Sequence, residues 1–124
     1  VVLSYLKQGE VAGVPDRHLC RVRAGAWFDV NHDVTVPDVI VNAMARGTVH
    51  VAENELGAVI TNNLYGFAWR DGVTVKVRNA VLTWLRSDAG QAALLAQARS
   101  QGHGLAKIEP KALGALVLPD ELLR

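Results

Sequence analysis

The sequence predicts an α+β fold, and two observations carry that prediction. Short apolar segments, separated by turn residues such as those at 13–16, 62–63 and 71–72, fill the first two-thirds of the chain, as is typical of β-structure. After Arg78 the apolar residues fall at three- and four-residue spacing, as on a helix. We therefore expect a mixed, mostly antiparallel sheet first, then a C-terminal pair of helices and a short final extended segment.

The N-terminal third contains one short helix or turn and one candidate strand. Leu3–Leu6 is interpreted as the helix or turn, ending before Gly9. His18–Val30 is interpreted as a strand or a hairpin arm, in which the two-residue period places Arg21 and Arg23 on one face. A turn is expected at Asn31-His32-Asp33.

The middle of the chain predicts further strands and a hairpin. Strands are expected at residues 39–41, 49–52 and 63–69, the last with Tyr65 on one of its alternating faces. Asp71-Gly72 predicts a hairpin turn, because Gly tolerates positive φ, and Val73–Val77 is expected to return from it as a strand.

The last third predicts two helices and short extended pieces. Val81, Leu82, Trp84 and Leu85 share one helical stripe, and Ser87 or Asp88 caps a second helix. That helix has an inner stripe at residues 94, 95 and 98 and is stopped by the glycines at 102 and 104. A strand at 105–108, a short helix from residue 110 and an extended piece at 116–118 follow.

Length and charge restrict the class of protein. The chain has 124 residues, enough for one core, so residues 1–124 are expected to form a single domain. It begins at Val1 without Met, which we interpret as a piece of a longer protein. No apolar run approaches the roughly 20 residues that span a bilayer. The formal charge is +1, but residues 31–60 carry one basic and four acidic side chains, so an anionic partner is expected to meet the other segments.

Catalytic chemistry is not apparent in the sequence. The four histidines are scattered without metal-ligand spacing, the single cysteine lies at an apolar position, and no phosphate-binding glycine loop is present. We therefore expect no catalytic residue, no metal and no cofactor in this chain.

Some residues indicate a binding surface instead. Arg21 and Arg23 lie close to Trp27, and Asn62, Asn63 and Tyr65 follow a chain reversal, while Lys107 follows the Gly102-His103-Gly104 turn. Arg and Asn can read base edges, Lys and Arg bind phosphates, and aromatic rings stack on bases. The competing interpretation is that the aromatic rings belong to the core and that the arginines form a solvated sheet face.

An ordered series of motifs resembles one family. The segments that carry the resemblance lie at residues 5–10, 20–30, 36–39, 61–65, 82–87, 102–110 and 116–119. Together they resemble the C-terminal target-recognition region of N6-adenine-specific DNA methyltransferases of bacterial restriction–modification systems. The chain departs from the family pattern at His103, where another Gly is expected, and at Trp84–Ser87, where a Leu-Asn-Ser ending is usual.

The resemblance implies a division of labour. The family's catalytic half carries an Asn/Asp-Pro-Pro-Tyr/Phe motif and binds S-adenosylmethionine, whereas this chain has four prolines and no two are adjacent. It would therefore be a cytoplasmic DNA-recognition domain that works with the catalytic domain of the same chain on double-stranded DNA. Arg21, Arg23, Asn62, Asn63, Tyr65 and Lys107 are the expected DNA contacts, and Trp27 would pack beside the arginines.

Two other functions stay open at this point. One is the recognition module of a multisubunit restriction system, which long heptad-patterned helical spacers would indicate. The other is a protein-interaction or scaffolding domain whose aromatic and arginine side chains face a protein partner.

Overall fold

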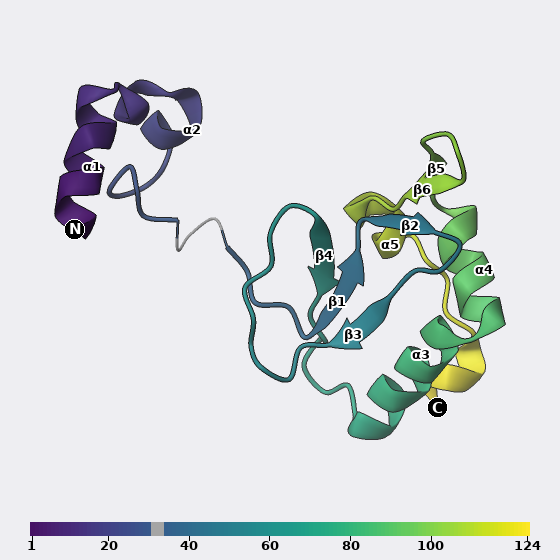
Figure 1. The fold of residues 1–124 in the computed structure, drawn as a ribbon. Coiled ribbons are helices and arrows are strands. Elements are labelled where there is room, and N and C mark those ends of the chain that lie inside the picture. Colours follow the sequence, from purple (N-terminus) through teal and green to yellow (C-terminus); the bar gives the residue numbers. More distant parts are fainter. Residues whose placement is uncertain (31–33) are drawn as a thin grey trace. The chain divides into compact units, whose positions relative to one another are not determined.

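The computed structural model describes residues 1–30 and 34–124, in two compact units, Val1–Thr35 and Val36–Arg124 (Figure 1). The turn expected at Asn31-His32-Asp33 lies outside the described residues. The described part of the chain contains five α-helices and two small antiparallel sheets, so the predicted α+β class is confirmed. The helix or turn expected at residues 3–6 and the strand expected at 105–108 are present, but the chain also has a helix at His18–Arg21 and a strand at Arg99–Ser100 that the sequence did not predict.

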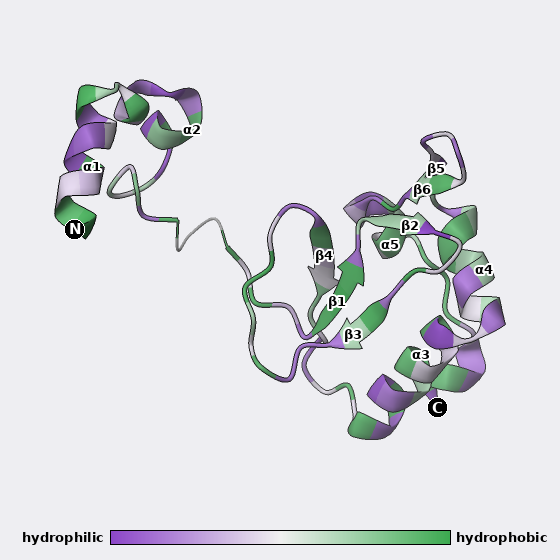
Figure 2. Ribbon diagram, in the orientation of Figure 1, coloured by the Kyte–Doolittle hydropathy of each residue, from purple (hydrophilic) through white to green (hydrophobic). Residues whose placement is uncertain are grey.

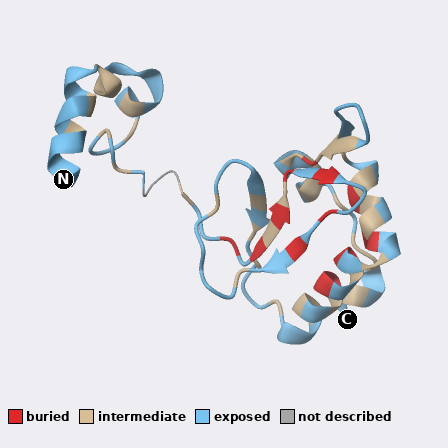
Figure 3. Ribbon diagram, viewed as in Figure 1, coloured by how far each residue is buried: buried red, intermediate tan, exposed pale blue. Residues whose placement is uncertain are grey.

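The N-terminal unit is helical. It contains α1 (Val2–Val11), the 3₁₀ turn η1 (Val14–Asp16) and α2 (His18–Arg21). The short helix expected at residues 3–6 is thus longer and passes through Gly9. None of the unit's described residues is buried, and Figure 3 accordingly shows no buried position there.

The strand expected at His18–Val30 is wrong. The amides of Cys20 and Arg21 both donate to the carbonyl of Arg17, which closes a helical turn. An alternation of only four residues fits one helical turn as well as a strand, and a strand needs a partner to satisfy its backbone groups. No described residue of this unit lies in a strand that could provide one.

The C-terminal unit contains both sheets. Sheet A has the order β3-β1-β4, from Val51–Glu53, Val39–Asn42 and Leu64–Phe67, as predicted in outline. Sheet B has the order β2-β6-β5, from Met44–Arg46, Leu105–Lys107 and Arg99–Ser100. Figure 2 shows β1 and β3 as largely hydrophobic and the loop between β5 and β6 as hydrophilic.

Two helices provide the other side of the core. They are α3 (Val75–Arg86) and α4 (Asp88–Ala96), and the short α5 (Pro110–Gly114) and the 3₁₀ turn η2 (Asp120–Leu123) follow. Ser87 accepts a hydrogen bond from the Gly90 amide, which confirms the predicted cap of the second helix. The core combines apolar side chains from both sheets and both helices: Val39, Val41, Ala45, Val49, Val51, Val81, Leu82, Leu85, Leu94 and Ile108.

The strand expected at Val73–Val77 is wrong, although the turn before it is present. Gly72 has a φ of +85°, but the chain then enters α3, whose N-cap Thr74 accepts from the Val77 amide. Val77 continues the four-residue spacing of the buried Val81 and Leu85, so the helical stripe begins within the β-branched run. A cap and a buried stripe outweigh the strand propensity of a few valines.

Candidate nucleic-acid interface

The first group of predicted site residues lies in the N-terminal unit. Arg21 ends α2 and is exposed, while a guanidinium nitrogen of Arg23 donates to the Trp27 carbonyl at 2.5 Å. The two arginines therefore do not share a strand face, as the sequence had predicted. Trp27 is half-buried and meets Phe28 edge to face at 5.6 Å. A Cβ added to Gly9 would lie 2.7 Å from the Trp27 ring, so this glycine lets the ring pack against α1.

The second group lies at the start of β4. Asn62 and Asn63 are exposed in a turn that the Leu64 amide closes by donating to the Thr61 carbonyl at 3.0 Å. Tyr65 is half-buried and lies directly opposite the buried Val41 in sheet A. Paired residues of a ladder point to the same face, so Tyr65 is on the core side of the sheet. The competing core interpretation of this ring thus agrees with its position.

Ala43 connects that turn to Lys107. It is the single residue between β1 and β2; its amide donates to the Asn63 carbonyl at 3.2 Å, and its carbonyl accepts from the Ile108 amide at 2.9 Å. The turn carrying Asn62 and Asn63 and the strand carrying Lys107 therefore flank the same residue. The structure brings these three predicted site residues into one region, from segments more than forty residues apart in the sequence.

Sheet B adds two cationic residues that sequence reasoning missed. Lys107 lies opposite Met44 on β2 and opposite Arg99 on β5, and Arg46 lies two residues beyond Met44. Opposed residues, and residues two apart on a strand, share a face. Arg46, Lys107 and Arg99 are thus all on one face of sheet B, which we call the outer face. The buried Ala45 is on the other face, toward the core.

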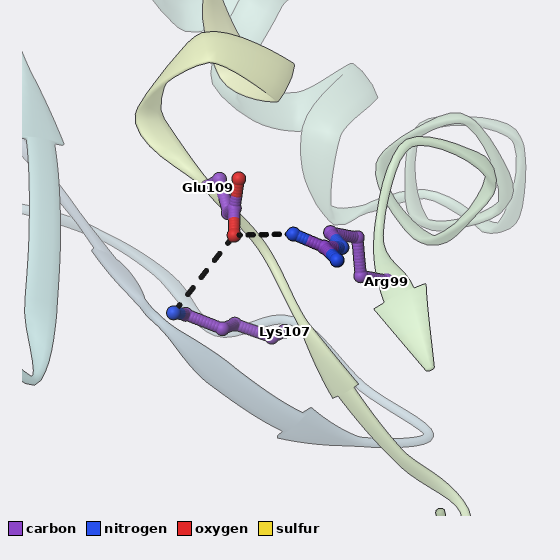
Figure 4. A network of polar contacts seen from close by, with 3 residues as sticks. All are labelled: Arg99, Lys107 and Glu109. Carbon is purple, nitrogen blue, oxygen red and sulfur yellow. Dashed lines mark ion pairs between the residues drawn. The ribbon is translucent and has the colours of Figure 1, made fainter. Parts of the chain in front are cut away.

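Glu109 links two of these cations. Its carboxylate lies 3.5 Å from an Arg99 guanidinium nitrogen and 3.8 Å from the Lys107 ammonium, as Figure 4 shows. The Arg99 side chain is 73% exposed, and those of Lys107 and Glu109 are 38% exposed. Arg46 is also exposed, and it comes from the acidic segment 31–60, which was not expected to meet an anion. Only the strand register reveals that it belongs with Lys107.

The hairpin that joins β5 to β6 shows the conformational cost of one departure from the family pattern. Gly102, His103 and Gly104 have φ values of +85°, +51° and +72°. The expected Gly at position 103 would adopt such a φ freely, whereas an L side chain does so at a cost.

The described residues also bear on two other features, a metal site and a membrane-spanning helix. No group of three or more His, Cys, Asp or Glu side chains among them is placed to hold a metal ion. None of their helices is both long and apolar enough to cross a membrane.

The comparisons with known proteins identify the family. A family model described as "Type II methyltransferase M.Eco57I, C-terminal domain" matches residues 2–124. Comparison with curated proteins and with solved structures found no match. Since the match covers all but the first residue, the chain belongs to the family of C-terminal domains of Type II methyltransferases typified by M.Eco57I.

Proposed function

We propose that residues 1–124 form the DNA target-recognition module of a site-specific adenine-N6 DNA methyltransferase. The observation that carries this proposal is the family match over residues 2–124 to the C-terminal domain of a Type II methyltransferase. The two units are then parts of one module. The methyl donor, S-adenosylmethionine, and the chemistry of methyl transfer are assigned to the catalytic domain of the same protein, which acts on cytoplasmic double-stranded DNA.

The exposed polar residues support distinct roles within this proposal. Methylation of adenine needs the base rotated out of the duplex, so a recognition module has to grip the neighbouring DNA. Asn62 and Asn63 are exposed in a turn and can donate to and accept from a base edge. Arg21 and Lys107 are assigned to phosphates, while Arg23 and Trp27 support the loop that follows α2.

Binding of the whole chain to a fluorescent duplex tests the proposal. A small module of formal charge +1 makes few phosphate contacts, so we expect weak binding that weakens further with salt, with a Kd on the order of 10⁻⁴ to 10⁻⁶ M. Anisotropy at 50 mM and 200 mM salt measures it. A chain that is folded by circular dichroism but shows no binding at the lower salt contradicts DNA contact by this module.

Base reading has its own test in the full-length enzyme. Replacing Asn62 by Ala should relax specificity at one position of the site, by about 1–3 kcal/mol, without weakening binding to every sequence. Asn79→Ala is the matched control, because Asn79 is exposed on α3. Equal methylation profiles of the two variants over a set of single-base site variants would contradict a role for Asn62.

The adenine assignment is tested by the product. The full-length enzyme, supplied with duplex DNA and labelled S-adenosylmethionine, should place the label on N6-methyladenine after digestion to nucleosides. Label on cytosine would refute the assignment.

One observation favours a second function, protein interaction. The N-terminal unit has no buried residue in its described part, and several large apolar side chains are exposed there: Leu3, Tyr5, Leu19 and Phe28. A contiguous exposed patch of such side chains would mark a protein contact. A scaffolding role predicts capture of a protein partner that Phe28→Ser abolishes and that added DNA leaves unchanged.

A further inference from the structure

The outer face of sheet B presents three cations in one row. In this row, Arg99 faces Lys107 across β5 and β6, and Arg46 lies diagonally across from Lys107 on β2. Neighbouring strands are about 4.8 Å apart, and diagonal neighbours about 7–8 Å. The first step is shorter than an extended Arg or Lys side chain, and the second is comparable to one in length. The three cationic groups can therefore contact successive anionic groups along a chain.

The charge balance of this row favours an anionic partner. Three cations and the one carboxylate of Glu109 leave a local net charge of +2. Within the described part of the chain, Arg46 has no acidic side chain at ion-pair distance. Exposed ion pairs such as those of Glu109 contribute only about 0–1 kcal/mol. A phosphate oxygen can therefore replace the carboxylate at little cost.

We propose that Arg46, Lys107 and Arg99 form a phosphate-contact row for the sugar–phosphate backbone of duplex DNA. This inference rests on the proposed function and adds the surface that meets the DNA. DNA is favoured over an acidic protein because its phosphate charges follow one another along an extended backbone, as the three cations do across the strands of sheet B. The contacts are independent of sequence, so they position the module while the turn at Asn62 and Asn63, beside the same sheet, reads bases.

The slope of log K against log salt concentration tests the row. Each phosphate contact contributes about 0.9 to that slope, so R46Q/R99Q/K107Q should lower it by about 2.7. Between 50 and 200 mM salt, that difference corresponds to a roughly 40-fold smaller loss of affinity than in the unchanged chain. The control R70Q/K76Q/R124Q removes three exposed charges outside sheet B and should leave most of the slope in place.

Titration of a 20-base-pair duplex into the whole chain and both variants separates the two proposals. If the unchanged chain binds and the row variant keeps the slope of the control, the row is wrong and the proposed function stands. If the unchanged chain does not bind at 50 mM salt, the proposed function fails and the row with it. If the chain bound poly-glutamate as tightly as DNA, the proposal that the row binds phosphates in preference to carboxylates would be overturned.

Glu109→Gln is a second, milder variant that leaves the cations in place. It removes the carboxylate that a phosphate must displace, so affinity for the duplex should rise several-fold at 50 mM salt. Unchanged or lower affinity would contradict the proposed contact, because the bound phosphates would then lie away from Glu109.

Discussion

Gly90 is the position at which two physical arguments predict opposite effects on stability for the same substitution, Gly90→Ala. It lies in the first turn of α4 and is buried. Helix propensity alone predicts that Gly90→Ala stabilises the protein by about 1 kcal/mol. A Cβ at this position, however, would lie 2.0 Å from the Trp84 carbonyl oxygen and 2.7 Å from the Leu85 Cα. The two helices are joined by a single residue, Ser87, so α4 starts directly against the last turn of α3.

The steric clash outweighs the gain in helix propensity, so Gly90→Ala is expected to destabilise the protein. Real Cβ atoms essentially never come within 3.0 Å of such atoms, so α3 and α4 would have to separate locally by about 1 Å. Both contacts are with backbone, which cannot rotate away as a side chain can. Overpacking of this kind costs about 1–3 kcal/mol or more, and Leu85 and Leu94, both buried, would lose contacts as the helices part. After subtraction of the propensity gain of about 1 kcal/mol, we expect a net loss of about 1–2 kcal/mol, toward the upper end of the overpacking range because both contacts are with backbone.

Urea unfolding followed by circular dichroism at 222 nm measures this loss, with Gly114→Ala as the matched control. Gly114 ends α5, its φ is not positive, and nothing lies within 4 Å of an added Cβ. That control should be neutral or stabilising, by up to about 1 kcal/mol. A Gly90→Ala protein at least as stable as the unchanged chain would refute the clash argument and the close approach of the two helices.

Substitutions at three further positions test hydrogen bonds and a strained backbone conformation in the C-terminal unit. The Gln91 side chain accepts a hydrogen bond from the Val49 amide and donates to the Val49 and Leu85 carbonyls. Gln91→Ala should therefore lower the free energy of unfolding by about 2 kcal/mol, and Gln91→Glu by more, because the carboxylate oxygens of Glu would face those carbonyls. Urea midpoints measure both losses. Asp38→Ala should cost about 1 kcal/mol in thermal unfolding, since the carboxylate accepts from the Trp69 amide at 2.7 Å, and Asp38→Asn should cost less because it keeps an acceptor. His103→Gly should raise stability by about 0.5 kcal/mol, since relief of the positive φ outweighs the added chain entropy, whereas His103→Val should lower it; a destabilised His103→Gly protein would contradict this.

The elements that the sequence predicted well are those with local signals. Ser87 caps α4 through its own side chain, Pro110 opens α5, and β6 follows the turn at Gly102–Gly104. Each signal acts over a few residues, through a cap, a fixed φ or a turn. The pattern at 18–30 failed because its alternation is too short to distinguish a strand from a helical turn, and only the presence of a partner strand could decide between them.

The site residues, too, fall into those that the sequence indicated and those that only the structure revealed. The sequence pointed to Lys107, Asn62 and Asn63 one at a time, and through the family resemblance. It did not indicate Arg46 or Arg99, because neither lies in a motif and Arg46 is the one basic residue of the acidic segment 31–60. Their place beside Lys107 follows from the pairing of β2, β6 and β5, because β2 lies about fifty to sixty residues before the other two strands in the sequence.

The sequence by itself determined the α+β class, the capped pair of helices and the family to which the chain belongs. These depend on local propensity, spacing and ordered motifs, which are all properties of neighbouring residues. Only the tertiary structure decided that β1 passes into β2 at Ala43 and that Arg46, Lys107 and Arg99 share a face. Strand register depends on which distant segments bury their apolar sides together, and a shift of one residue in any of these strands would turn that strand's cation toward the core.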